Sequence, residues 1–170
     1  MIAATTDISS NLAVTARPPG WLLLHIPLVI AAYLFLLVGA AAGLLFIFQE
    51  RRIKRHSSIA VTSRLPSLDA MEHFIYRMIL ASFPLLTLGM LLGGHWALRT
   101  RGRFWGWDPT ETFSFVTWII YAIYLGLRWG RGWRGRRSTY LALSGFAIIL
   151  ATLVALFFYS PLHTMGGPKV

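Results

Sequence analysis

Four long apolar stretches divide this chain, and they limit the folds open to it more than any other feature. They cover residues 21–48, 74–98, 108–127 and 140–159. Each is about as long as the roughly 20 residues with which an α-helix crosses a bilayer. Charged residues make up only 13% of the chain, against roughly 25% in soluble domains. We therefore predict an all-α membrane protein with four transmembrane helices.

The basic residues between these stretches predict how the helices are oriented. The connections 49–73 and 128–138 hold five Lys or Arg residues each, and both fall on one side of a four-span chain. The positive-inside rule assigns them to the cytoplasmic side of a bacterial cytoplasmic membrane. Both termini and the 99–111 connection then face the outer, periplasmic side. Because the net charge of +10 is divided among short loops between apolar helices, we interpret it as loop arginines that set the topology of a protein surrounded by membrane lipid, and not as nucleic-acid binding.

The chain reads as one membrane domain, residues 21–166, after a disordered lead at 1–20 and before a short tail at 167–170. It contains no cysteine, which excludes thiolate-bound zinc, iron–sulfur clusters and cysteine-attached haem within this chain.

Two patterns predict how the helices pack. Glycine pairs at 39/43 and 89/93 give small faces that suit close helix contacts, and they favour a protein partner. A stripe at helical spacing, Thr117, Tyr121, Tyr124 and Arg128, is predicted to face other helices or a polar partner rather than lipid.

The connection before the third helix ends in a helix-start pattern. Asp108 suits the N-cap, Pro109 the first helical position, and Glu111 the position from which a capping-box acid reaches back. Trp105 and Trp107 precede this cap, among Arg99, Arg101 and Arg103. Flat aromatic faces beside fixed positive charge suit a flat apolar ligand with anionic edges. Plain alternatives are an interfacial aromatic belt, simple helix capping and arginines that contact lipid headgroups.

Three of the five histidines map to the same outer layer: His25, His95 and His163. Neutral imidazole is a common axial ligand of haem iron. His25 and His163 belong to the first and fourth helical regions, so they are able to hold a haem from both faces if those helices are neighbours.

The stretch from Gly102 to Thr112, with Trp105, Trp107 and Asp108 at its centre, resembles the "WWD" signature of membrane proteins that handle haem. These are the CcsA/ResC, CcmC and CcmF proteins of cytochrome c maturation, and the surrounding sequence is most similar to CcsA/ResC. Leu24-His25 and Leu162-His163 resemble the segments that carry that family's two external haem ligands.

The resemblance implies a cytochrome c biogenesis protein that presents non-covalent b-type haem at the outer face for attachment to apocytochrome c. It implies His25 and His163 as iron ligands, and Trp105, Trp107 and Asp108 as the haem platform. Arg101 and Arg103 are candidates for pairing with haem carboxylates, and His95 for a substitute ligand. It also implies a ResB/CcsB-like membrane partner. As an enzyme, the chain would be at most the haem-handling component of a cytochrome c synthase.

Departures from the family pattern leave two alternatives open. Arg101 stands where the family usually has Trp, and Gly126 stands where it typically has the histidine of an inner haem site. These changes favour a relative of the HemX type, which acts on haem synthesis. A b-haem-binding membrane subunit is the other alternative, although His25 and His163 offer a single haem site.

Overall fold

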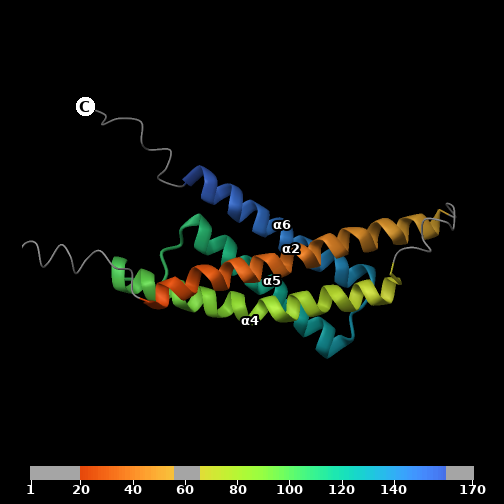
Figure 1. The fold of residues 1–170 in the computed structure, drawn as a ribbon, viewed down its shortest axis with the longest axis horizontal. Helices are drawn as coiled ribbons and strands as arrows, with labels where there is room; N and C mark the ends of the chain where they lie inside the picture. Colours follow the sequence, from red (N-terminus) through yellow and green to blue (C-terminus); the bar gives the residue numbers. More distant parts are fainter. Residues whose placement is uncertain (1–19, 56–65, 160–170) are drawn as a thin grey trace, which may run out of the picture.

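The computed structural model describes residues 20–55 and 66–159, and all regular structure within them is helical. Four helices follow one another: α2 (Gly20–Lys54), α4 (Leu68–Arg101), α5 (Pro109–Arg131) and α6 (Arg136–Tyr159). They run in alternating directions along an elongated bundle (Figure 1). The all-α prediction is confirmed. The predicted tail, and the lead up to residue 19, lie outside the described residues.

The two ends of the bundle differ in chemistry, and we name them accordingly. At the basic end, α2 and α5 finish in turns that contain Arg51, Arg52, Lys54, Arg128 and Arg131, and α4 and α6 begin. At the Trp-loop end, residues 102–108 connect α4 to α5; we call this segment the Trp loop.

The helices are longer than the apolar stretches that predict them. The 35 residues of α2 correspond to about 52 Å of helix, whereas the hydrocarbon core of a bilayer is about 30 Å thick. Backbone hydrogen bonding therefore continues through the polar flanks. Capping residues set the ends: the Ser67 side chain accepts from Ala70 N at 3.2 Å and so caps the start of α4.

Three helices in the described part of the chain are long and apolar enough to cross a membrane: Leu23–Lys54, Leu68–Arg101 and Pro109–Arg131. They indicate a multi-pass membrane protein. The fourth span, predicted at 140–159, and the sides on which the termini lie stay predictions.

Close helix contacts use the glycines that the sequence analysis singled out. The most extensive interfaces join α2 to α4 and α5 to α6. A Cβ on Gly39 would lie 3.1 Å from Met78 Cβ, and one on Gly89 would lie 2.7 Å from Val29 Cγ2. A Cβ on Gly43 would lie 3.2 Å from Leu143 Cδ2 on α6. These glycine faces therefore pack against other helices of the same chain, and not against a separate protein partner.

The predicted stripe on α5 faces the interior, as expected. Thr117, Tyr121 and Tyr124 are at most 2% exposed, and the Tyr121 hydroxyl donates to the carbonyl of Ala142 on α6 at 3.3 Å. The side chain of Arg128, the last residue of the stripe, is 7% exposed. The stripe thus holds α5 against the other helices rather than against lipid.

Candidate functional site

The Trp loop is fixed at its junction with α5 by local hydrogen bonds. Asp108 caps the helix by accepting from Glu111 N at 2.8 Å, and Pro109 occupies the first helical position, as predicted. Glu111 does not complete a capping box with Asp108 N. Its Oε2 accepts from Gly106 N at 2.6 Å, so the carboxylate reaches two residues further back and secures the middle of the loop. The backbone of Trp107 is left-handed (φ 57°), which lets the chain turn sharply into the cap.

Arg101, at the end of α4, joins the two sides of the loop. Its Nη1 lies 3.3 Å from Asp108 Oδ2 and 3.6 Å from Glu111 Oε1. Arg101 therefore pairs with carboxylates of this chain, which were not among the partners expected for it from the sequence. Arg103 is exposed and does not line the cavity described below.

Aromatic rings continue from the loop into the groove between α4 and α5. Trp105 contacts Trp107 edge to face at 6.2 Å and Phe115 at 5.7 Å. Trp118 stacks between Phe115 and Phe83, and its Nε1 donates to Thr87 Oγ1 at 2.9 Å. Edge-to-face and offset rings are the stable geometries of aromatic pairs. The row thus holds Trp105 in place, whereas Trp107 is 72% exposed.

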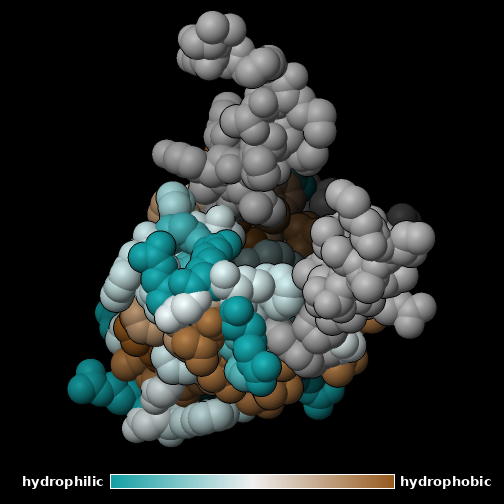
Figure 2. Space-filling model, turned by 90° about the vertical axis from the view of Figure 1, so that its left-hand side faces the viewer, coloured by the Kyte–Doolittle hydropathy of each residue, from teal (hydrophilic) through white to brown (hydrophobic). Residues whose placement is uncertain are grey.

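A cavity of about 460 Å³ opens between α2, α4 and the Trp loop. This volume lies in the range of cofactor sites. Its wall is largely apolar, with Val29, Leu86 and Trp105, and Leu153 comes from α6. The polar side chains in the wall are His25, Tyr33, Arg101, Asp108, Thr110, Glu111 and Ser114. Figure 2 views the bundle from this end, where hydrophilic and hydrophobic surfaces adjoin. A mostly apolar wall with a few polar groups suits a flat amphipathic ligand.

His25 is the histidine that the structure brings into this cavity. It is half-buried, and its Nδ1 lies 2.8 Å from the carbonyl oxygen of Gly89. A carbonyl only accepts, so Nδ1 carries a proton, and in the neutral ring Nε2 then carries the lone pair. This is the tautomer that metal-ligating histidines use when a backbone carbonyl orients them. Gly93 makes room for the ring, because a Cβ there would lie 3.0 Å from His25 Cε1.

The remaining predicted residues divide into three groups. Trp105 and Asp108 line the cavity together with His25 and Arg101. His95 and Trp107 lie near the same end but outside the cavity wall. His163 lies outside the described residues. Within residues 20–55 and 66–159, no group of three or more His, Asp or Glu side chains is arranged to hold a metal ion. A haem needs fewer side-chain ligands than such a site.

Several cavity residues were not predicted from the sequence: Tyr33, Met90, Phe104 and Ser114. Ser114 lies one turn after Thr110 on α5, so helical spacing could have found it. Phe104 packs over Gly94, where an added Cβ would overlap the ring. Met90, Phe104 and Trp105 also line a second, wholly apolar groove of about 360 Å³.

Residues 3–163 match the family described as cytochrome C assembly protein. The chain belongs to this family. It is 35% identical over 179 residues to the "Cytochrome c biogenesis protein CcsA" of Prochlorococcus marinus strain MIT 9312, covering 94% of this chain and 58% of the relative. CcsA of Gloeothece citriformis is 31% identical, with 80% of this chain and 55% of the relative covered. No solved structure matches the chain.

The assignment to CcsA-type proteins, made above from the Trp-rich motif, is confirmed. The chain nevertheless spans little more than half the length of these relatives. CcsA of Chlamydomonas reinhardtii, 35% identical over 136 residues, is covered over 37% of its length. The activity of the longer proteins as a whole is therefore proposed, and not established, for this chain.

Proposed function

We propose that this chain acts in cytochrome c biogenesis by binding b-type haem non-covalently in the Trp-loop cavity. It presents the haem at the outer face of the bacterial cytoplasmic membrane for attachment to apocytochrome c. The observation that carries this proposal is the hydrogen bond between His25 Nδ1 and the Gly89 carbonyl, inside a cavity bounded by Trp105. It supports an imidazole oriented for iron within an aromatic, largely apolar wall.

The residues of the cavity suit a haem. His25 Nε2 is the proposed iron ligand on one face. Trp105 and Phe104 offer apolar surface to the macrocycle and keep water from it. Thr110, on the first turn of α5, is available as a hydrogen-bond donor to a carboxylate group, whereas Ser114, one turn later, hydrogen-bonds with Tyr33. Bound haem would supply vinyl groups that react with cysteine thiols of the substrate, while this chain holds and orients the cofactor.

His163 is the proposed second iron ligand, as the family resemblance implies, and it lies outside the described residues. Leu153 of α6 reaches the cavity, which is compatible with a ligand from the segment that follows α6. His95 lies outside the wall and is the weaker candidate.

Arg101 and Arg103 have different proposed roles. Arg101 shapes the loop through Asp108 and Glu111, whose two carboxylates offset its positive charge in the cavity wall. Arg103, which is exposed within the Trp loop, is the proposed contact for a haem carboxylate that projects from the cavity or for an acidic partner. A ResB/CcsB-like membrane protein is the proposed partner, and apocytochrome c the substrate.

An optical spectrum of the purified full chain, supplied with haem, tests this function. The expected result is a low-spin spectrum with two imidazole ligands, which is lost in His25→Ala and in His163→Ala. His73→Ala is the matched control, because His73 is exposed on α4 near the basic end. A folded wild-type protein that takes up no haem, or an unchanged spectrum in His25→Ala, would contradict the proposal.

The HemX-type alternative rests on Gly126. This position is exposed on α5, and a Cβ there meets nothing within 4 Å. Space therefore does not explain the absence of the histidine that the family usually has. Loss of an inner ligand with the outer cavity retained fits a protein that senses haem or regulates its synthesis. Normal c-type cytochrome yield in a deletion strain, with altered haem synthesis, would favour this alternative.

A further inference from the structure

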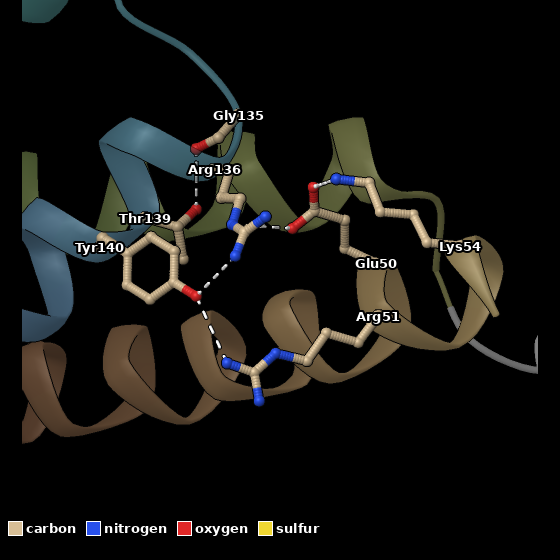
Figure 3. Close-up of polar contacts among 7 residues, drawn as sticks. All are labelled: Glu50, Arg51, Lys54, Gly135, Arg136, Thr139 and Tyr140. Carbon is tan, nitrogen blue, oxygen red and sulfur yellow. Dashed lines mark hydrogen bonds and ion pairs between the residues drawn. The ribbon is translucent and has the colours of Figure 1, made fainter.

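The basic end of the bundle carries a polar cluster that is separate from the Trp-loop cavity. In Figure 3, the hydroxyl of Tyr140 lies between the guanidinium groups of Arg51 and Arg136. Arg136 Nη2 donates to this hydroxyl at 3.3 Å and Arg51 Nη2 at 3.5 Å. A guanidinium has only donors, so the two cations converge on one oxygen atom. The contact joins the end of α2 to the start of α6.

The cluster has more positive than negative charge. Glu50 is its carboxylate, which accepts from Lys54 Nζ at 2.8 Å and lies 3.7 Å from Arg136 Nε. With Arg51, the cluster holds three cations and one carboxylate, and the first turn of α6 adds no acidic residue. The hydrogen bond to Tyr140 and the negative charge of Glu50 raise the pKa of the Arg136 guanidinium above its already high ordinary value. The unbalanced charge suits an anion.

The surface beside this cluster is apolar. Leu44 and Phe48 are 61% and 48% exposed on α2. They lie seven and three positions before Arg51, and so on the same side of the helix. Arg51 and Tyr140 are also exposed, so a ligand outside the bundle can reach them. The Arg52 guanidinium lies 4.7 Å from the centre of the Phe48 ring, at the boundary between charged and apolar surface. This order, from charge to exposed apolar side chains, matches that of a phospholipid.

We propose that Arg51, Arg136 and Tyr140 form a headgroup site for an anionic phospholipid. The phosphodiester takes the place between the two guanidinium groups, and the Tyr140 hydroxyl turns to donate to it. The acyl chains lie along Leu44 and Phe48. Such a lipid joins α2 to α6 at an end where the protein itself supplies too little negative charge.

Charge and position select among phosphate compounds. Paired guanidinium groups bind phosphate oxygens through short, charge-assisted hydrogen bonds. A zwitterionic lipid brings an ammonium group that the cations repel, so an anionic headgroup is favoured. Free phosphate has the same oxygen atoms but cannot use the apolar surface of Leu44 and Phe48, so the lipid is favoured over the free ion.

The test uses the full chain in detergent, titrated with phosphatidylglycerol, phosphatidylcholine or inorganic phosphate, with bound lipid counted by native mass spectrometry. We expect one saturable phosphatidylglycerol, bound roughly tenfold more tightly than phosphatidylcholine and not displaced by phosphate. The double substitution Arg51→Gln/Arg136→Gln should weaken binding roughly tenfold or more. Tyr140→Phe, which keeps both charges and the ring, should weaken it about fivefold.

The matched control is Arg131→Gln/Arg134→Gln, which removes two exposed arginines from the same end. Binding within twofold of wild type in this control supports the site. Equal losses in both double variants would show general surface charge and overturn it. Absence of a preference for phosphatidylglycerol, or displacement by millimolar phosphate, would also overturn it. If Arg51→Gln/Arg136→Gln does not fold, Tyr140→Phe decides alone: unchanged affinity refutes the site.

Discussion

The imidazole of His25 on α2 donates to the carbonyl oxygen of Gly89 on α4 at 2.8 Å. This bond ties the orientation of one side chain to the distance between two helices. Gly89 permits that distance, because a Cβ at this position would lie 2.7 Å from Val29 Cγ2. The tautomer of His25 therefore depends on how closely α2 packs against α4.

Substitution of Gly89 tests this link. In Gly89→Ala the added methyl meets the stiff, β-branched Val29, so α2 must move away from α4 and the His25 bond lengthens. We expect haem affinity to fall roughly tenfold, because loss of the hydrogen bond that orients a ligating histidine typically costs that much or more in metal affinity. Haem titration followed by absorbance measures the change.

Gly126→Ala is the control for that experiment. It adds the same methyl to α5, where nothing lies within 4 Å. Replacing a helical Gly by Ala should leave haem affinity unchanged and raise stability by about 0.5–1 kcal/mol. Equal haem affinity in the two alanine variants would refute the link between the Gly89 contact and His25.

Asp108 has two properties that can be tested separately: an oxygen atom that caps α5 and a negative charge. Asp108→Asn keeps an oxygen that can accept from Glu111 N, whereas Asp108→Ala removes it. We expect Asp108→Ala to lower the free energy of unfolding by about 1 kcal/mol and to loosen the Trp loop. Asp108→Asn should stay close to wild type in melting temperature and haem titration. A haem affinity reduced equally in both variants would instead assign the effect to the charge.

Substitutions of Arg101 and Arg103 should differ in their effect on haem affinity, although both arginines are exposed and lie two positions apart. Arg101→Gln removes the ion pairs to Asp108 and Glu111, and because the Arg101 side chain is 55% exposed, stability should fall by less than about 1 kcal/mol. Haem affinity should fall about fivefold as the loop loosens, which corresponds to about 1 kcal/mol. Arg103→Gln should keep haem affinity. The opposite order would show that Arg103, and not Arg101, supports the cavity.

Local patterns in the sequence were sufficient to predict the helices and the start of α5. The Asp108-Pro109 start depends on residues within one turn, so the local sequence encodes it. The interior position of Thr117 and Tyr121 followed from helical spacing for the same reason.

The cavity wall could not be predicted in this way, since Tyr33 and Leu153 meet only when α2 and α6 approach the Trp loop. Arg101 was expected to pair with a ligand. Its pairing with the chain depends on where the Glu111 carboxylate turns, and two backbone N–H groups within reach compete for that carboxylate. Sequence spacing does not decide between Gly106 N and Asp108 N, whereas the shape of the folded loop does.

The buried ion pair between Arg128 and Glu72 gives a final prediction, because it joins α5 to α4 at the end opposite the Trp-loop cavity. Arg128 Nη1 donates to Glu72 Oε1 at 2.5 Å, both side chains are 7% exposed, and the guanidinium also covers the Tyr76 ring at 4.3 Å. Removal of one partner leaves a charge buried without its counter-ion. We therefore expect Arg128→Gln to lower the free energy of unfolding by about 3–5 kcal/mol.

The double variant Glu72→Gln/Arg128→Gln should lose less than the sum of the single variants, since two neutral amides leave no buried charge. Arg131→Gln, an exposed arginine one turn later, should change stability by no more than about 0.5 kcal/mol. Denaturant unfolding followed by circular dichroism measures the wild type, both single variants of the pair, the double variant and Arg131→Gln. Because the pair is remote from His25, the folded fraction of each variant should keep the wild-type haem spectrum. Additive losses in the double variant would show that the two side chains act independently.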